Sequence, residues 1–336
     1  MYRQKQMALG KIIRVLMVTT EWPSDNIPSA VPFLVRDVDL LRKHNLIVDV
    51  LHFTGGKNPY NYLRATLQVM KKLRLVKYNV VHAQWGQSAI PVFFSSLPLI
   101  TTFRGSDLFG ITNKNGNYTL MGALLKLVSK VVAIRSDYVI LVSNRMLPLV
   151  SKKRNVTVLP SGINLNLFSP GSKDEARKKL QIDPIKKVIL FGGDINRPDK
   201  RYHLARKAKE ILDLDLPVEL LTAKVDHSEM PIFYRAADVL LMTSKHEGSP
   251  NMVKEALACN LPVVSVDVGD VKERINGLPG CFICESDNPE EIARALKSSL
   301  TYDNRDFNFR NTVLELNEDI LIIKQVDIYK QVIDQS

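Results

Sequence analysis

The chain has 336 residues, of which 45% are hydrophobic and 24% are charged, and its formal net charge is +11. This composition excludes a disordered chain, and the length suffices for two domains with separate cores. No apolar run reaches the roughly 18 to 20 residues of a membrane-spanning helix, and no small-residue cleavage site follows the basic N-terminus, so we expect a cytoplasmic protein.

The positive charge is concentrated in the first half of the chain. Residues 1–160 contain 22 Lys or Arg and 7 Asp or Glu, whereas the remainder contains 24 and 28. The excess of +15 on one half favours an anionic partner, which could be a membrane surface, an anionic glycan or lipid acceptor, or nucleic acid.

Apolar strands alternate with helical stretches along both halves, which predicts an α/β protein with two doubly wound, mostly parallel sheets. In the first half the expected strands are Ile13–Thr19, Ile47–Phe53, Val80–Ala83, Leu99–Thr102, Tyr138–Val142 and Val156–Leu159, and the expected helices are Phe33–Lys43, Tyr60–Val76, Ser88–Phe94 and Leu120–Ile134. In the second half the expected strands are Lys187–Phe191, Val218–Leu221, Val239–Met242, Pro262–Ser265 and Cys281–Cys284.

A turn-rich segment, Ser161–Pro170, divides the two halves. We therefore predict an N-terminal domain over 1–165 and a C-terminal domain over 166–317. A last helical stretch lies within 318–336.

The stretch Tyr60–Val80 interleaves apolar residues with Lys71, Lys72, Arg74 and Lys77. Two interpretations fit this pattern. It is either a basic amphipathic helix that lies on an anionic membrane, or a helix packed on a sheet with a solvated basic face. Three cysteines are too few for a disulfide framework, and Cys281 and Cys284 are interpreted as strand residues rather than as a redox or metal pair.

The most informative segment is EGSPNMVKEALACNLP, residues 247–262, which follows the expected strand at Val239. Gly248, Ser249, Pro250 and Asn251 have turn chemistry, with Pro250 suited to the first turn of the helix that follows. Free N–H groups at such a helix start attract phosphate. A ligand site at this strand end is therefore expected.

The two glutamates of this segment have alternative roles. Glu255 either accepts hydrogen bonds from vicinal ribose hydroxyls or is an exposed helix residue. Glu247 either contacts a sugar and acts as an acid or base, or stabilises the helix N-terminus.

The spacing E-x7-E, followed by EALAC and PVV, closely resembles the retaining GT-B glycosyltransferases of family 4. Three further stretches support this resemblance in the family's order: TTFRGSD from Thr101, LPSGINLNLFSP from Leu159 and LFGGDINRPDKR from Leu190. The resemblance implies two Rossmann-like domains facing a deep cleft, with the C-terminal helix packing back on the first domain. It also implies transfer from a nucleotide diphosphate sugar with retention of configuration.

A basic cluster is the expected diphosphate site, because cations must neutralise the charge that grows on the leaving group. By resemblance Lys200 matches the family's diphosphate lysine and follows the flexible Gly193. The family's arginine position holds Asp194, so we take Arg197 as a displaced replacement, the alternative being a surface residue. The candidate catalytic residues are Glu247, Lys200 and Arg197, and the candidate binding residues are Glu255, Gly248, Ser249, Pro250, Asn251, Gly193, Arg201, Arg104 and Asp107.

Arg104 opens a loop in which the family usually has histidine. We interpret its guanidinium as facing an acidic group on the sugar or acceptor, or else as paired with Asp107 or a neighbour. In the entry loop, residues 29–32 (Ser-Ala-Val-Pro) stand where the family often has glycines, so Trp22 and Pro28 are candidates to shape the acceptor site. The side chains of His82, Gln84 and Trp85 either line the acceptor side or pack at a strand end.

The sequence thus predicts a glycosyltransferase of polysaccharide biosynthesis that acts on a glycan or lipid-linked acceptor, at the inner face of a membrane. No metal is expected, because neither Asp-x-Asp motif lies at a convincing strand end. No other cofactor and no nucleic acid is expected either. The alternatives are a GT-B nucleotide-sugar epimerase and a non-catalytic basic adaptor that binds membrane or nucleic acid. The base, the sugar, the acceptor, the linkage and the oligomeric state are not readable from the chain.

Overall fold

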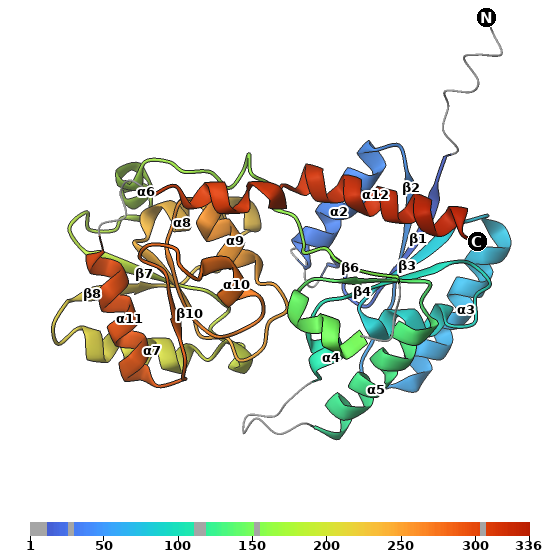
Figure 1. Cartoon of the computed structure of the whole chain (residues 1–336), viewed down its shortest axis with the longest axis horizontal. Helices are drawn as coiled ribbons and strands as arrows, with labels where there is room; N and C mark the ends of the chain where they lie inside the picture. The colour runs from blue at the N-terminus through green and yellow to red at the C-terminus, as the bar shows by residue number, and fades with distance from the viewer. Residues whose placement is uncertain (1–11, 26–29, 111–118, 151–154, 303–306) are drawn as a thin grey trace, which may run out of the picture. The chain divides into compact units, whose positions relative to one another are not determined.

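The computed structural model describes residues 12–25, 30–110, 119–150, 155–302 and 307–336. The chain divides into two compact units (Figure 1), one formed by residues 1–160 with 319–336 and the other by residues 161–318. Each unit contains its own parallel sheet. Within the described ranges, no helix is both long and apolar enough to cross a membrane.

The first unit is built on a six-stranded sheet with the order β2-β1-β3-β4-β5-β6, in which every pairing is parallel. Strands β1, β3, β4 and β5 are almost wholly buried, because helices cover both faces, and this explains their nearly continuous apolar sequences. All six predicted strands are confirmed to within one residue at either end: β1 (Arg14–Thr19), β2 (Ile47–His52), β3 (Val80–Gln84), β4 (Leu99–Phe103), β5 (Tyr138–Leu141) and β6 (Val156–Val158).

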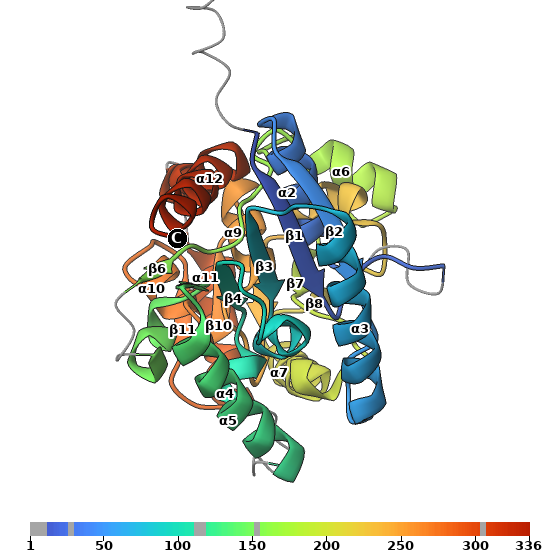
Figure 2. The same cartoon turned by 90° about the vertical axis from the view of Figure 1, so that its right-hand side faces the viewer.

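Helices lie on opposite faces of this sheet because the direction of the crossovers changes after β2. The step from β1 to β2 runs toward one edge, and the steps from β2 through β5 run toward the other. Right-handed crossovers therefore place α2 (Pro32–Lys43) on one face and α3 (Pro59–Leu75), η1 (Gly86–Val92) and α5 (Leu120–Arg135) on the other. Figures 1 and 2 show this division, with the C-terminal helix α12 (Glu318–Asp334) on the α2 side.

One predicted helix of the first unit is wrong in type. The stretch predicted as Ser88–Phe94 is the 3-10 helix η1, and Pro91 lies inside it. Proline has no backbone N–H and breaks the hydrogen-bond ladder of an α-helix, so the segment takes the tighter form. Two shorter elements also belong to this unit, α4 (Ser106–Phe109) and η2 (Asn144–Val150).

The second unit has a five-stranded parallel sheet with the order β11-β10-β9-β7-β8. Its strands are β7 (Lys187–Phe191), β8 (Val218–Leu221), β9 (Val239–Met242), β10 (Val263–Val266) and β11 (Phe282–Cys284), and its helices are α6 (Lys173–Leu180), α7 (Tyr202–Leu212), α8 (Met230–Ala236), α9 (Asn251–Ala258), α10 (Val271–Ile275) and α11 (Pro289–Thr301). Short 3-10 helices η3 (Pro198–Lys200), η4 (His227–Glu229) and η5 (Phe309–Leu316) complete it. The prediction of two doubly wound α/β domains is confirmed.

The chain passes from one unit to the other at two places that lie side by side. Ile163 donates a backbone hydrogen bond to Leu316 at 2.8 Å and accepts one from Glu318 at 3.0 Å. A Cβ on Gly162 would lie 2.5 Å from the Cα of Glu318, so only glycine allows this approach. The two compact units divide between residues 160 and 161, and these bonds place Ile163 with the second unit.

The cysteines of the CxxC motif are buried and carry free thiols. Cys281 accepts a hydrogen bond from the backbone N–H of Val263 at 3.3 Å. Burial raises the pKa of Cys281 to about 11 and that of Cys284 to about 12, so both thiols stay protonated at neutral pH.

Candidate functional site

The strand order of the second sheet points to a ligand position at its carboxyl edge. The chain moves from β7 outward to β8, then returns across β7 to β9 and continues through β10 to β11 in the opposite direction. The helices after β7 and β9 therefore lie on opposite faces, which leaves a crevice where their loops diverge. The loop after β7 contains Lys200 and the loop after β9 contains Glu247.

These two residues form an ion pair, with Lys200 Nζ 2.5 Å from Glu247 Oε1. Their side chains keep 14% and 16% of their surface exposed, so the pair is sheltered but reachable. The loops are also joined by their backbones and by one hydroxyl. Thr243 Oγ1 donates to Lys200 O at 2.8 Å, and Lys245 N donates to Asp199 O at 2.8 Å.

Two glycines support this ion pair by having no side chain. A Cβ on Gly193 would lie 2.9 Å from Lys200 Cγ, so the lysine stem rests on the bare backbone. Gly269, in the loop after β10, has a φ of +55°, and a Cβ there would lie 2.8 Å from Gly248 O. Gly193, which was predicted to be flexible, thus positions Lys200. Gly269, which no sequence pattern marked, holds the turn after Glu247.

The turn leads into the N-terminus of helix α9. Pro250 is the residue before the helix rather than part of its first turn, and its side chain offers no cap to the first N–H groups. Ser249 is held by Asp270, with Ser249 Oγ donating to Oδ2 at 2.8 Å. Asn251 Oδ1 is buried and accepts no hydrogen bond from any residue that the structure describes. A buried acceptor and uncapped N–H groups suit a ligand that has both hydroxyls and negative charge.

Glu255 is a buried residue, and the alternative of an exposed helix glutamate is wrong because helix α9 turns this side chain toward α8 and η4. Its two carboxylate oxygens interact with His227 Nε2 and with the hydroxyl of Tyr234, each at 2.8 Å. Burial and the nearby carboxylate raise the pKa of Tyr234 well above its usual value, so the hydroxyl stays a donor. No sequence pattern marked His227 or Tyr234.

The two arginines of the basic cluster differ in environment. Arg197 is 60% exposed and pairs with Asp199 through two hydrogen bonds of 2.7 and 3.1 Å. Arg201 is largely covered, donates to Thr243 O at 2.6 Å and pairs with Asp287. Arg201 therefore fixes the carboxyl end of β9, whereas the guanidinium of Arg197 sits on the surface of its own loop.

In the first unit, Arg104 is surrounded by protein groups. Its guanidinium donates twice to Gln84 Oε1, at 2.7 and 3.2 Å, and lies 3.9 Å from Asp37. It also stacks over the rings of Phe33 and Trp85, with centroid distances of 4.4 and 5.5 Å. The alternative of an ion pair with a neighbour is thus observed, and the partner is Asp37.

Asp107 has a different task from the one proposed for Arg104. Its carboxylate accepts backbone hydrogen bonds from Gly86, Arg104, Gly105 and Leu108, at distances between 2.9 and 3.2 Å. A carboxylate with these donors fixes the loop after β4 against the start of η1. Asp107 therefore stabilises the conformation of the loop that contains Arg104.

The strand-end residues His82 and Gln84 are packed inside the first unit. His82 Nδ1 lies 2.7 Å from the Tyr329 hydroxyl of α12, and Nε2 lies 2.7 Å from Thr102 Oγ1. Burial and the charge of Arg104 lower the pKa of His82 to about 3, so the ring is neutral at neutral pH. In the entry loop Pro28 and Ser29 lie outside the described residues.

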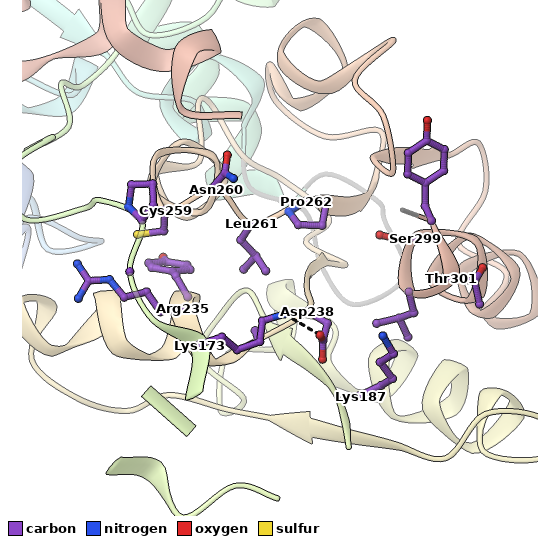
Figure 3. A pocket seen from close by; sticks show the side chains of 16 residues that line it. Lys173, Lys187, Arg235, Asp238, Cys259, Asn260, Leu261, Pro262, Ser299 and Thr301 are labelled. Carbon is purple, nitrogen blue, oxygen red and sulfur yellow. Dashed lines mark hydrogen bonds and ion pairs between the residues drawn. The ribbon is translucent and has the colours of Figure 1, made fainter. Parts of the chain in front are cut away.

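A separate cavity of 470 Å³ lies elsewhere in the second unit (Figure 3). It is lined by Lys187 at the start of β7, by Asp238 just before β9 and by Pro262 just before β10. Asp238 is already paired with Lys173 and Arg177. This cavity opens at the amino edge of the sheet, opposite to the edge where open α/β sheets bind ligands, so it is not the candidate site.

Comparisons with known proteins show which proteins the chain resembles. Residues 174–301 match the model of the family described as Glycosyl transferases group 1. The putative teichuronic acid biosynthesis glycosyltransferase TuaC of Bacillus subtilis is 27% identical over 232 residues, which cover 62% of this chain and 57% of that protein. D-inositol 3-phosphate glycosyltransferase 1 of Catenulispora acidiphila is 28% identical over 177 residues, 42% of each chain. The chain thus matches about half the length of these relatives.

Solved structures share the fold at low identity. Sucrose-phosphate synthase from Thermosynechococcus elongatus matches with a TM-score of 0.78 at 15% identity, covering 97% of this chain and all of that one. Anabaena HepE, solved in complex with UDP and glucose, matches with a TM-score of 0.64 at 16% identity over 97% of this chain and 99% of that one. Residues 174–301 are thus similar to the group 1 glycosyltransferases, and the chain has the two-domain α/β fold of these solved structures, the GT-B fold.

Proposed function

We propose that the protein is a retaining glycosyltransferase of family 4 that transfers a sugar from a nucleotide diphosphate sugar to a glycan or lipid-linked acceptor. The observation that carries the proposal is the Lys200–Glu247 pair, which sits on two glycines at the carboxyl edge of the second sheet. The group 1 match over 174–301 and the glycosyltransferase activities by which the relatives are named support the same reaction.

In this proposal Lys200 binds the diphosphate of the donor. An ammonium group in a sheltered site stabilises the charge that develops on the leaving phosphate more strongly than water does. The first N–H groups of α9 add partial positive charge beside it. Arg201, which already fixes the end of β9, contributes a second nearby cation. Arg197 takes part if a bound diphosphate replaces Asp199 as its partner.

Glu247 and the turn that follows it hold the transferred sugar. Carboxylate oxygens accept hydrogen bonds from sugar hydroxyls, and the buried Oδ1 of Asn251 supplies another acceptor. Glu255 holds the ribose. His227 and Tyr234 occupy one direction on each of its oxygens, which fixes the carboxylate and leaves other lone pairs for the two ribose hydroxyls.

The reaction breaks the bond between the sugar C1 and the phosphate oxygen and forms a bond between C1 and the acceptor oxygen on the same face. The acceptor proton passes to the departing phosphate oxygen, so the products are the nucleoside diphosphate and the glycoside with the donor's configuration. The positive charge of the first unit favours an anionic acceptor. We further propose that the reaction needs no metal and takes place at the inner face of a membrane.

A thermal-shift panel of nucleoside diphosphates and their sugars tests the binding part of the proposal. A ligand at about 100 times its dissociation constant adds about 2.7 kcal/mol of stability, so the matching base should raise the melting temperature of the wild type. Glu247→Gln should reduce the shift given by the sugar donor and leave the shift given by the nucleoside diphosphate. Equal shifts from all bases, or none from any, would contradict a donor site.

Product analysis tests the reaction. Incubation with donor and acceptor should give a glycoside with the donor's anomeric configuration, and chelation of divalent metals should leave the rate unchanged. An inverted product would refute retention, and loss of the rate with chelator would refute metal independence. Conversion of the donor sugar without any acceptor would favour an epimerase instead.

A further inference from the structure

The outer faces of helices α3 and α5 display large apolar side chains. On α5, Leu120, Leu124, Leu127, Val131 and Ile134 recur at alternating spacings of four and three residues, and each is between 46% and 91% exposed. On α3, Tyr60, Leu63, Leu67 and Met70 recur in the same way and are between 45% and 64% exposed. A helix of a globular protein normally turns such a stripe toward the core.

The opposite faces of α3 and α5 already contribute the residues that these helices bury in the core of the first unit. On α3 the buried residues are Ala65 and Val69, and on α5 they include Val132 and Ala133. The exposed stripes are therefore not needed to attach the helices to the sheet. Large exposed apolar patches on a folded protein mark surfaces that contact a partner or a membrane.

The two stripes belong to one face of the molecule. Helix η1 packs against both α3 and α5 on the same side of the first sheet, and Figure 2 shows these two helices. Phe94, which is 96% exposed, follows η1 in the segment between them. Arg135 at the end of α5 holds this segment by donating to Phe93 O at 3.0 Å and to Ser95 O at 2.7 Å. We call α3, Phe94 and α5 together the basic apolar face.

Charge selects the occupant of this face. Helices α3 and α5 contain seven cationic residues and no Asp or Glu: Arg64, Lys71, Lys72, Arg74, Lys126, Lys130 and Arg135. A second copy of the chain would bring the same positive charge to the contact and be repelled. A surface of anionic lipid offers negative charge to the cations and an acyl region to the apolar side chains.

We propose that the basic apolar face docks on an anionic membrane surface, with Phe94 and the leucines of α3 and α5 inserted at the level of the headgroups. This placement specifies which part of the first unit contacts the bilayer. It includes α5, whose sequence did not suggest membrane contact, as well as α3. The proposal rests on the exposed side chains and the charge, and it does not depend on the proposed reaction.

Vesicle co-sedimentation of the full chain tests the proposal. Wild type should bind vesicles of phosphatidylcholine containing about 30% phosphatidylglycerol, bind neutral phosphatidylcholine vesicles far less, and be released by salt. The variants Leu124→Glu/Leu127→Glu and Lys71→Glu/Arg74→Glu should each lower the affinity for anionic vesicles roughly tenfold or more. These positions are exposed, so circular dichroism should show unchanged folding.

A matched control uses two apolar residues of the second unit that are even more exposed than Leu124 and Leu127. Ile185→Glu/Leu214→Glu should bind anionic vesicles as wild type does. A dye attached through Leu127→Cys should shift to shorter emission wavelength on anionic vesicles, whereas a dye attached through Leu214→Cys should not. The three native cysteines are buried and protonated, so labelling favours the introduced thiol.

Three outcomes would overturn the proposal. The first is equal binding of wild type and both glutamate variants to anionic vesicles. The second is equal binding of wild type to neutral and anionic vesicles. The third is a wild-type dimer that does not bind vesicles and becomes a monomer in Leu124→Glu/Leu127→Glu, which would assign the face to a second copy. Transfer to a soluble acceptor analogue should be unaffected in every variant, which separates failure of docking from failure of the proposed reaction.

Discussion

The carboxyl edges of the two sheets use positive charge in opposite ways. At the edge of the second sheet, Lys200 pairs with the carboxylate of Glu247, and both side chains retain some exposure beside an uncapped helix start. At the edge of the first sheet, Arg104 is enclosed by Gln84, Asp37 and two aromatic rings. Similar topological positions thus hold one charge that is open to a ligand and one that the protein itself satisfies.

This contrast separates binding from stability. A buried cation whose acceptors come from the protein contributes to folding, and its removal leaves those acceptors without a donor. Lys200 is covered about as much as Arg104 but interacts with fewer protein groups, so its removal should cost less folding free energy, and its charge remains available to a ligand. Substitutions at Lys200 should therefore affect activity, whereas substitutions at Arg104 should affect stability.

The largest effect is expected from Lys200→Ala. Loss of one group that stabilises developing charge costs roughly 10² to 10³-fold in turnover, and we expect a loss of that size in kcat with the natural donor. The free energy of unfolding should fall by less than in Arg104→Leu, although the carboxylate of Glu247 loses its partner. Steady-state kinetics and urea unfolding measure the two quantities on the same preparation.

The matched control for this prediction is Lys297→Ala, which removes a lysine from a surface pair with Asp215 in the same unit. It should leave kcat unchanged. If Lys200→Ala retained wild-type turnover, or if Lys297→Ala lost as much, the assignment of the diphosphate site would be refuted.

The next effect is expected from Arg104→Leu, which keeps the apolar stem but removes the donors to Gln84 and the charge near Asp37. We expect a loss of about 2 to 4 kcal/mol in the stability of the first unit. Both tryptophans of the chain, Trp22 and Trp85, lie in that unit, so their fluorescence during urea unfolding follows it selectively.

An exposed arginine provides the comparison for Arg104. Arg206→Leu removes the partner of Glu210 on the surface of α7 and should cost less than about 0.5 kcal/mol. Full stability of Arg104→Leu together with a changed donor preference would instead support the alternative in which this guanidinium faces an acidic group of a ligand.

A pH-dependent effect of intermediate size is expected from His82. Its folded-state pKa is lowered to about 3, so between this value and its ordinary pKa of 6.5 the unfolded chain binds a proton that the folded chain does not. The stabilisation is fully present above pH 6.5 and is lost as the pH falls, by up to about 1.4 kcal/mol per pH unit. The groups that face the ring are Tyr329, Thr102, Gln84 and Arg104.

Urea unfolding from pH 4.5 to 7.5, followed by tryptophan fluorescence, checks this prediction. His82→Gln should be less stable at pH 7.5 because it loses the hydrogen bonds to Tyr329 and Thr102, yet its stability should depend less steeply on pH. Parallel curves for wild type and His82→Gln would show that the ring is not held neutral.

The fold was predictable from the sequence because buried parallel strands need nearly continuous apolar runs. The predicted bounds of the strand Lys187–Phe191 match the observed ones. Its nearly continuous apolar sequence, KVILF, is typical of a strand that is buried on both faces. The 3-10 type of helix η1 was not predicted. The two prolines in and after this segment indicate a short element but do not determine whether it is an α-helix or a 3-10 helix.

The site was predictable only in part, because side-chain partners come from distant segments. The positions of Lys200 and Glu247 followed from strand ends, but Tyr234 and His227, which hold Glu255, are 21 and 28 residues away along the chain and match no motif. Arg104 and Gln84 face each other only because β3 and β4 are neighbours in the sheet, which spacing along one strand cannot reveal.

The smallest effect is expected from Gly193→Ala. This substitution tests how strongly activity depends on the position of the Lys200 ammonium group. The added methyl would lie 2.9 Å from Lys200 Cγ, so the flexible lysine stem must move aside and carry its ammonium group away from Glu247. A displacement of this kind should lower kcat about tenfold, while stability changes by less than about 1 kcal/mol. Gly171→Ala is the control, because its methyl would meet the Arg235 side chain at 2.8 Å with the same crowding but at the amino edge of the sheet. If both variants lost activity equally, crowding alone would explain the loss. If only Gly193→Ala lost activity, the donor would react at the carboxyl edge of the sheet, beside Lys200, and not at the cavity of the amino edge.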